Sequence, residues 1–201
     1  MIVPYASRTG TRRNLAGLRL AGWRLLVSAR GVLRTEGFPY ALDNGAWTAF
    51  QAGGSFNVSA FEKAVGMLGA EADWVVVPDK VADGDVSLRM AEEWLPRLDH
   101  LRLLIAVQNG MSHRDVSPWL GPRCGIFLGG TTAWKIGTMR SWGELARERG
   151  CHYHVARVNS QRRISHAQHA GAHSFDGTRA SRWAVGLAPL DRQVRQGAFA
   201  W

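Results

Sequence analysis

The chain has 201 residues, of which 46% are hydrophobic and 20% are charged. This composition is typical of a folded globular protein and excludes a disordered or fibrous one. The length is enough for one well-buried core and lies near the lower end for a closed α/β barrel, so we expect a single domain over residues 1–201. Lys and Arg outnumber Asp and Glu by 25 to 16, which gives a formal net charge of +9 and a surface that favours polyanions such as nucleic acids.

The sequence contains no targeting or cross-linking signal. No hydrophobic run approaches the roughly 20 residues of a membrane span, and the first residues lack the pattern of a signal peptide. Cys124 and Cys151 are the only cysteines, too few for a disulfide framework or a Cys-rich zinc site. We therefore expect a cytoplasmic protein with reduced thiols, and neither a metal nor a cofactor.

Short apolar runs, several of them rich in β-branched residues, recur along the chain and predict eight strands. Some are hydrophobic almost throughout, as expected for a parallel sheet that is covered on both faces. The runs span residues 1–6, 23–29, 39–45, 73–79, 102–108, 124–130, 152–158 and 172–178.

Helical patterns separate most of these runs. They lie at 11–21, 57–71, 85–98, 138–149 and 160–171. Asn57 and Asp85 are predicted N-caps. No clear helix joins the second and third runs, and the stretch 110–122 is irregular. Strands that alternate with helices indicate βαβ units, and eight of them favour a (β/α)8 TIM-type barrel with some helices reduced; an open doubly wound sheet is the alternative.

The predicted strands share an unusual way of ending. Five runs end in polar or glycine residues: Asp43-Asn44-Gly45, Pro78-Asp79, Gln108-Asn109-Gly110, Gly129-Gly130 and Asp176-Gly177. In a barrel these ends meet at the C-terminal face, where active sites of this fold are built. Asp and Asn before Gly are also common turn formers, but turn chemistry explains neither Gln108 nor the recurrence. We interpret the pattern as a catalytic cleft.

The residue types in this cleft match a nucleobase. Carboxylates that lie close together cannot all ionise freely, so their pKa values should separate, which suits one as a nucleophile and another as a proton donor. Gly129 and Gly130 would let backbone N–H groups approach a flat ligand closely. Together with Asp and Gln side chains, such amides complement the donors and acceptors of a purine edge.

Six motifs in order, between residues 38 and 178, resemble the tRNA-guanine transglycosylase superfamily: LDNGAW, VVPD, VQNG, FLGG, HVARVNS and HSFDGT. The likeness is greatest to its small phage and bacterial members, which place 7-deazaguanine bases in DNA. The resemblance implies a DNA-guanine transglycosylase that exchanges guanine for a preQ0-type 7-deazaguanine base through a covalent glycosyl-enzyme intermediate.

The resemblance also implies roles for individual residues. Asp176 is similar in position to the nucleophile that attacks C1′, and Asp43 to the acid/base that handles the proton of the leaving and incoming bases. Asp79 resembles the residue that accepts from the guanine N1 and N2 hydrogens. Gln108 and the backbone of Gly129 and Gly130 resemble the groups that read O6.

Two departures from the tRNA enzymes favour the DNA branch. Residues 179–201 hold no Cys or His, so the zinc site of the tRNA enzymes has no ligands here, and Asp43 is followed by Asn-Gly-Ala-Trp in place of Ser-Gly-Gly-Phe. A transglycosylase acting on tRNA or another RNA, and a non-catalytic basic nucleic-acid-binding barrel, are the alternatives. The implied partners are DNA and a 7-deazaguanine base, in the host cytoplasm if a phage encodes the protein. A homodimer and a larger modification complex both stay open.

Basic and aromatic residues near the predicted cleft suit a polynucleotide. Because a base inside a duplex is unreachable, the target must be flipped out or single-stranded, with cationic groups on its phosphates. Trp47 and Trp134 follow the polar strand ends and are candidates to stack on a base, with core packing as the alternative. The predicted nucleic-acid contacts are Lys135, Arg157, Asn159, Arg162, Arg163 and Arg179.

Overall fold

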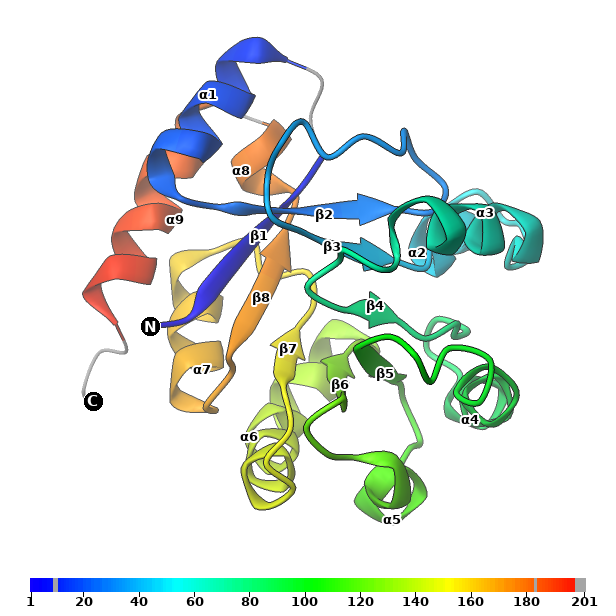
Figure 1. Ribbon diagram of the computed structural model, residues 1–201. Coiled ribbons are helices and arrows are strands. Elements are labelled where there is room, and N and C mark those ends of the chain that lie inside the picture. Colours follow the sequence, from blue (N-terminus) through cyan, green and yellow to red (C-terminus); the bar gives the residue numbers. More distant parts are fainter. Residues whose placement is uncertain (9–10, 183, 198–201) are drawn as a thin grey trace.

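The computed structural model describes residues 1–8, 11–182 and 184–197 (Figure 1). Its eight parallel strands follow one another around a closed barrel in which β8 pairs with β1. This is the TIM-type barrel that the sequence predicts, and the open sheet is excluded. The strands are β1 Val3–Ser7, β2 Arg24–Ser28, β3 Tyr40–Asp43, β4 Val75–Val76, β5 Leu103–Val107, β6 Cys124–Leu128, β7 Tyr153–Val155 and β8 Ser174–Gly177.

Helices surround the ring of strands (Figure 1). They are α1 Arg12–Ala21, α2 Ala46–Gln51, α3 Val58–Leu68, α4 Gly84–Trp94, α5 His113–Val116, the 3-10 helix η1 Ser117–Trp119, α6 Thr132–Glu148, α7 Gln161–His169, α8 Arg179–Arg182 and α9 Ala184–Gln196. As predicted, β2 passes to β3 without a helix. None of the helices in the described part of the chain has the length and apolar character needed to cross a membrane.

The predicted N-caps have different outcomes. Asn57 is confirmed, because its side chain accepts a hydrogen bond from the backbone N of Ala60 at 2.8 Å. The prediction that Asp85 is an N-cap is wrong, because α4 begins at Gly84. The cap is Asp83, whose side chain accepts a hydrogen bond from the backbone N of Val86 at 3.1 Å. The helix predicted from residue 138 is also longer, since α6 begins at Thr132.

The barrel has two hydrophobic layers. Tyr5, Trp74 and Phe127 belong to a layer inside the ring of strands, whereas Val155 and Phe175 belong to the layer between strands and helices. Side chains alternate between the two faces of a strand. The polar residues that alternate with these outer residues on β7 and β8 therefore point into the barrel.

Candidate active site

A cavity of about 920 Å³ lies at the C-terminal ends of the strands. Its wall contains the three carboxylates that the sequence places in a cleft: Asp43 at the end of β3, Asp79 after β4 and Asp176 in β8. Of the other predicted site residues, Gln108, Gly129, Arg157 and Asn159 also line this cavity. The strand ends therefore converge as predicted.

Asp176 is held through one of its two oxygens. Its Oδ1 accepts a hydrogen bond from Nε2 of His154 at 3.0 Å and another from the backbone N of Arg157 at 3.1 Å. Its Oδ2 has no hydrogen-bond partner among the described residues. The side chain is 7% exposed, so its orientation is fixed by the barrel while one oxygen stays available to a ligand.

His154 is the main site residue that sequence reasoning did not assign. It lies inside the barrel, fully buried, with its ring stacked on Phe127 at 4.9 Å between centroids and 4.7 Å from the ring of Trp74. Burial lowers the pKa of His154, against the opposing effect of Asp176, so the imidazole is neutral. The available signal was the alternation of His154 with apolar residues on one strand.

Asp43 is placed to gain and lose a proton. Its Oδ2 accepts from the backbone N of Gly45 at 3.1 Å. Desolvation and the nearby negative charge of Asp176 raise the pKa of Asp43 to about 6. A carboxyl group that titrates so close to neutral pH is suited to general acid and base catalysis.

Asp79 is clamped between two amide side chains. Nδ2 of Asn44 donates to its Oδ1 and Nε2 of Gln108 donates to its Oδ2, both at 2.7 Å. Asp79 is 6% exposed, and burial raises its pKa to about 7 although both hydrogen bonds act in the opposite direction. The clamp fixes the plane of the carboxylate at the cavity wall.

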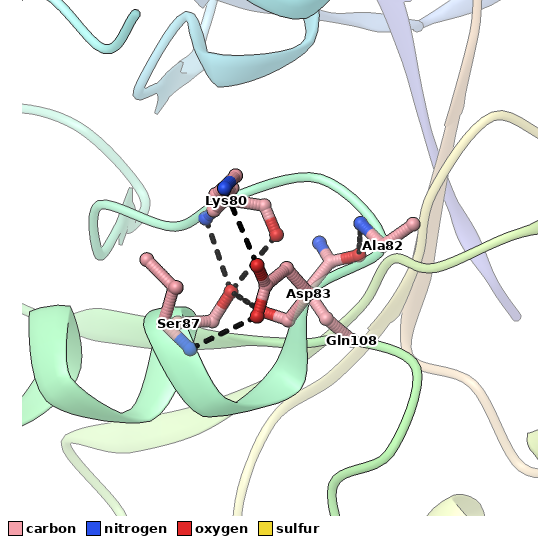
Figure 2. Close-up of polar contacts among 6 residues, drawn as sticks. Lys80, Ala82, Asp83, Ser87 and Gln108 are labelled. Carbon is pink, nitrogen blue, oxygen red and sulfur yellow. Dashed lines mark hydrogen bonds and ion pairs between the residues drawn. The ribbon is translucent and has the colours of Figure 1, made fainter.

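The residues that follow Asp79 are held by hydrogen bonds from two sides, and Figure 2 shows these contacts at Lys80 and Ala82. Oε1 of Gln108 accepts from the backbone N of Ala82 at 2.9 Å, and the hydroxyl of Ser87 contacts both the N and the O of Lys80 at 3.0 Å. Nζ of Lys80 lies 3.4 Å from Oδ2 of Asp83. Lys80 therefore pairs with Asp83.

The backbone amides expected to read O6 are already used within the protein. The N of Gly129 donates to the O of Val107 at 3.0 Å, and the N of Gly130 donates to Oε1 of Gln108 at 2.7 Å. A Cβ at Gly129 would lie 2.4 Å from Nε2 of Gln108. Close packing against Gln108 thus explains why residue 129 is a glycine. Nε2 of Gln108 has two N–H groups, of which one donates to Asp79, so the other is the donor left for a ligand.

Arg157 and Trp47 form a flat wall of the cavity. The guanidinium of Arg157 donates to the O of Gly130 and lies 4.1 Å from the ring centroid of Trp47. Both side chains line the cavity. Trp134, in contrast, packs on Trp142 with 6.3 Å between centroids and is absent from the cavity wall, so it is not placed to stack on a base there.

One predicted phosphate contact is wrong. Lys135 is 3% exposed, and its Nζ donates to the O of Ala156. Burial lowers its pKa to about 7, with a further contribution from the positive charge of Arg157. The side chain is thus enclosed by protein and cannot reach a phosphate. Its sequence position, between a predicted strand that ends at residue 130 and a helix predicted from residue 138, gave no sign of this burial.

The other predicted contacts lie around the same end of the barrel. Arg162 and Arg163 begin α7, which follows β7, and Arg179 begins α8, which follows β8. Arg162 and Arg179 are exposed and Arg163 is partly exposed. The backbone N of Arg179 donates to Oδ1 of Asn159 at 3.0 Å, which joins these two loops. Contact with nucleic acid stays a prediction for each of them.

Fold and cavity define an α/β-barrel protein with a carboxylate-lined pocket at the C-terminal face of its strands. No protein-family model and no curated protein matches the chain. In the described part of the chain, no group of three or more His, Cys, Asp and Glu side chains is arranged to hold a metal ion. The chemistry of the pocket is therefore argued from its own residues.

Proposed function

We propose that this chain is a glycosyl-transferring enzyme of the guanine transglycosylase type, which exchanges guanine in DNA for a 7-deazaguanine base. One observation carries the proposal. A single cavity contains Asp176, with one oxygen held by His154 and Arg157 and the other without a protein partner, and Asp43, whose pKa is raised to about 6. A fixed nucleophile and a separate proton carrier are what a double displacement needs.

The reaction follows from these two carboxylates. Oδ2 of Asp176 attacks C1′ of the target nucleoside, the glycosidic bond breaks, and the leaving guanine takes a proton from Asp43. The incoming base then gives a proton to Asp43 and attacks C1′, which releases Asp176. Two displacements at one carbon give net retention, as in retaining glycosidases. Each proton that Asp43 loses in the first half is returned in the second.

The clamped carboxylate supports recognition of a purine edge. Asp79 accepts one hydrogen bond on each oxygen and retains lone pairs for the N–H donors of a base. Such donors favour the ionised carboxylate, which offsets the effect of burial on its pKa. Gln108 offers its second N–H to a carbonyl oxygen, and the flat wall of Arg157 and Trp47 suits stacking.

The test is incorporation of labelled guanine into polymer, run in parallel on duplex DNA, single-stranded DNA and tRNA. We expect label in DNA with the wild type and loss of incorporation with Asp176→Asn and Asp43→Asn. Asp99→Asn is the matched control, because Asp99 is exposed and lies outside the cavity.

Each alternative has its own outcome. Label in tRNA alone would support the RNA-modifying enzyme. No label in any polymer, with salt-sensitive binding retained by all of the variants, would contradict catalysis and support a nucleic-acid-binding barrel.

A further inference from the structure

Three consecutive hydrogen bonds lead from Asp176 through the inside of the barrel. Oδ1 of Asp176 lies 3.0 Å from Nε2 of His154, and Nδ1 of His154 lies 2.8 Å from Oγ of Ser174. The same Oγ lies 2.7 Å from Nε2 of His152. His154 pairs with Ser174 across β7 and β8, and His152 immediately precedes β7, so the chain of contacts follows two neighbouring strands.

The far end of this chain of contacts reaches a second cavity. His152 lines a cavity of about 1180 Å³, whose wall also includes Arg102 and Leu103 at the start of β5 and Gly125 near the start of β6. This cavity lies at the N-terminal ends of the strands, whereas Asp176 opens to the cavity at their C-terminal ends. The contacts therefore connect the two ends of the barrel.

Hydrogen-bond chemistry fixes the direction of every bond. An ionised Asp176 can only accept, so Nε2 of a neutral His154 carries the proton and its Nδ1 is an acceptor. The single hydroxyl hydrogen of Ser174 then goes to Nδ1 of His154, and Oγ must accept from Nε2 of His152. All three donors thus point toward Asp176, and no group is left with a mismatched partner.

The surroundings keep both imidazoles neutral. Ionisable groups near His154 are Asp176, His152, Tyr5, which packs edge-on at 5.9 Å, and Lys135, whose positive form opposes a second positive charge. Burial lowers the pKa of His152 to about 3, and the nearby His154, His173 and Arg102 contribute in the same direction. A chain of neutral rings can pass a proton by exchanging tautomers without storing charge in the barrel.

We propose that His152, Ser174 and His154 form a relay that orients Asp176 and lets it exchange protons with the cavity at the N-terminal end of the barrel. The relay rests on the proposed function, because it serves a nucleophile whose own cavity is covered by bound nucleic acid. Asp43 and Asp176 lie close enough to influence each other, and only the form with Asp176 ionised can attack.

The proton balance of the relay is simple. A proton on Oδ1 of Asp176 moves to Nε2 of His154, the proton on Nδ1 of His154 moves to Ser174, and the hydroxyl proton of Ser174 moves to Nε2 of His152. His152 releases its Nδ1 proton to water in the second cavity. Both rings end as the other neutral tautomer, and one proton has left the active site; the reverse sequence returns it.

The first test reads the tautomers directly, in the full chain labelled with 15N-histidine. Two-bond proton–nitrogen NMR correlations should show His154 and His152 as neutral Nε2–H tautomers at pH 7. Ser174→Ala removes a single oxygen and leaves both rings; His154 should stay the Nε2–H tautomer that Asp176 requires, whereas His152 loses its acceptor and should become a mixture of tautomers. A wild-type His154 protonated on Nδ1 would overturn the relay.

The second test measures the route of exchange. With single-stranded DNA bound, the His154 ring proton should exchange with solvent several-fold more slowly in His152→Phe than in the wild type. His166→Phe is the matched control, because His166 lines the same cavity but makes no contact in the relay. Equal rates in wild type and His152→Phe, or equal slowing in both variants, would overturn the route. Ser174→Ala gives the same comparison should His152→Phe fail to fold.

Activity separates this inference from the proposed function. In the base-exchange assay, Ser174→Ala should lower kcat, because the ring of His154 that donates to Asp176 loses its second hydrogen bond. Absence of base exchange by the wild type would contradict the proposed function, while the tautomers and the proton-exchange rates would still test the relay. An active enzyme with His154 protonated on Nδ1 would sink the relay alone.

Discussion

At the scale of single residues, two effects on the pKa of Asp79 oppose each other: hydrogen bonds from amide side chains and burial. Asn44 and Gln108 both present N–H donors to it, which favours the carboxylate, yet burial raises its pKa to about 7. The native protein therefore binds a proton at this side chain up to a higher pH than the unfolded chain does. Burial therefore makes ionisation of Asp79 unfavourable in the folded protein. A ligand that donates N–H groups to the carboxylate would stabilise its ionised form.

This conflict predicts a pH dependence of stability. The folded pKa of Asp79 lies above the ordinary value of 3.8, so its contribution is present below pH 3.8 and is lost as pH rises to about 7. The free energy of unfolding should fall by up to about 4 kcal/mol across this window, at about 1.4 kcal/mol per pH unit. Urea unfolding between pH 4 and 8 measures it against Asp79→Asn, which should lose this part of the slope. Parallel slopes in the two proteins would contradict the prediction.

The sequence predicted the positions of the three carboxylates because they end apolar runs, and strand ends in a barrel must converge. It could not predict which oxygen of Asp176 is held, because His154 reaches it across two strands whose register the sequence does not state. The same holds for Lys135, whose burial depends on how α6 packs over the end of β7.

At the scale of elements, the strands were easier to predict than the helices. Each buried strand is an apolar run by itself, whereas α9 contains Gly186 and Pro189, which argue against a helix when only local propensity is considered. Tertiary contacts outweigh that propensity. Leu190 and Val194 are buried, and Nε1 of Trp23 donates to Oδ1 of Asp191 at 3.0 Å.

The start of α4 offers a direct comparison of the predicted and observed caps. Asp83 accepts from the backbone N of Val86 and pairs with Lys80, while Asp85 is a first-turn residue without a cap bond. Asp83→Ala should therefore lower Tm more than Asp85→Ala, since it removes a cap and Asp85→Ala removes only a favourable charge at the helix N-terminus. Scanning calorimetry measures the Tm of both variants. A larger loss of Tm in Asp85→Ala would support the cap predicted from the sequence.

At the scale of the whole molecule, the two ends of the barrel differ in the residues that line their cavities. The C-terminal end combines the carboxylate cavity with exposed arginines at the starts of α7 and α8, the helices that follow β7 and β8. The N-terminal end also contains cationic residues, among them Arg102 and Arg147 around the second cavity. A net charge of +9 therefore does not by itself say which end binds a polyanion.

Charge reversal at each end decides which one binds. If nucleic acid lies over the carboxylate cavity, Arg162→Glu and Arg179→Glu should weaken binding to single-stranded DNA, whereas Arg147→Glu at the opposite end should bind nearly as the wild type does. Each lost phosphate contact should also reduce the slope of log K against log salt by about 0.7. Fluorescence anisotropy over a salt series gives both quantities. A larger loss for Arg147→Glu would place the polymer at the N-terminal end, away from Asp176, and would contradict the proposed mechanism.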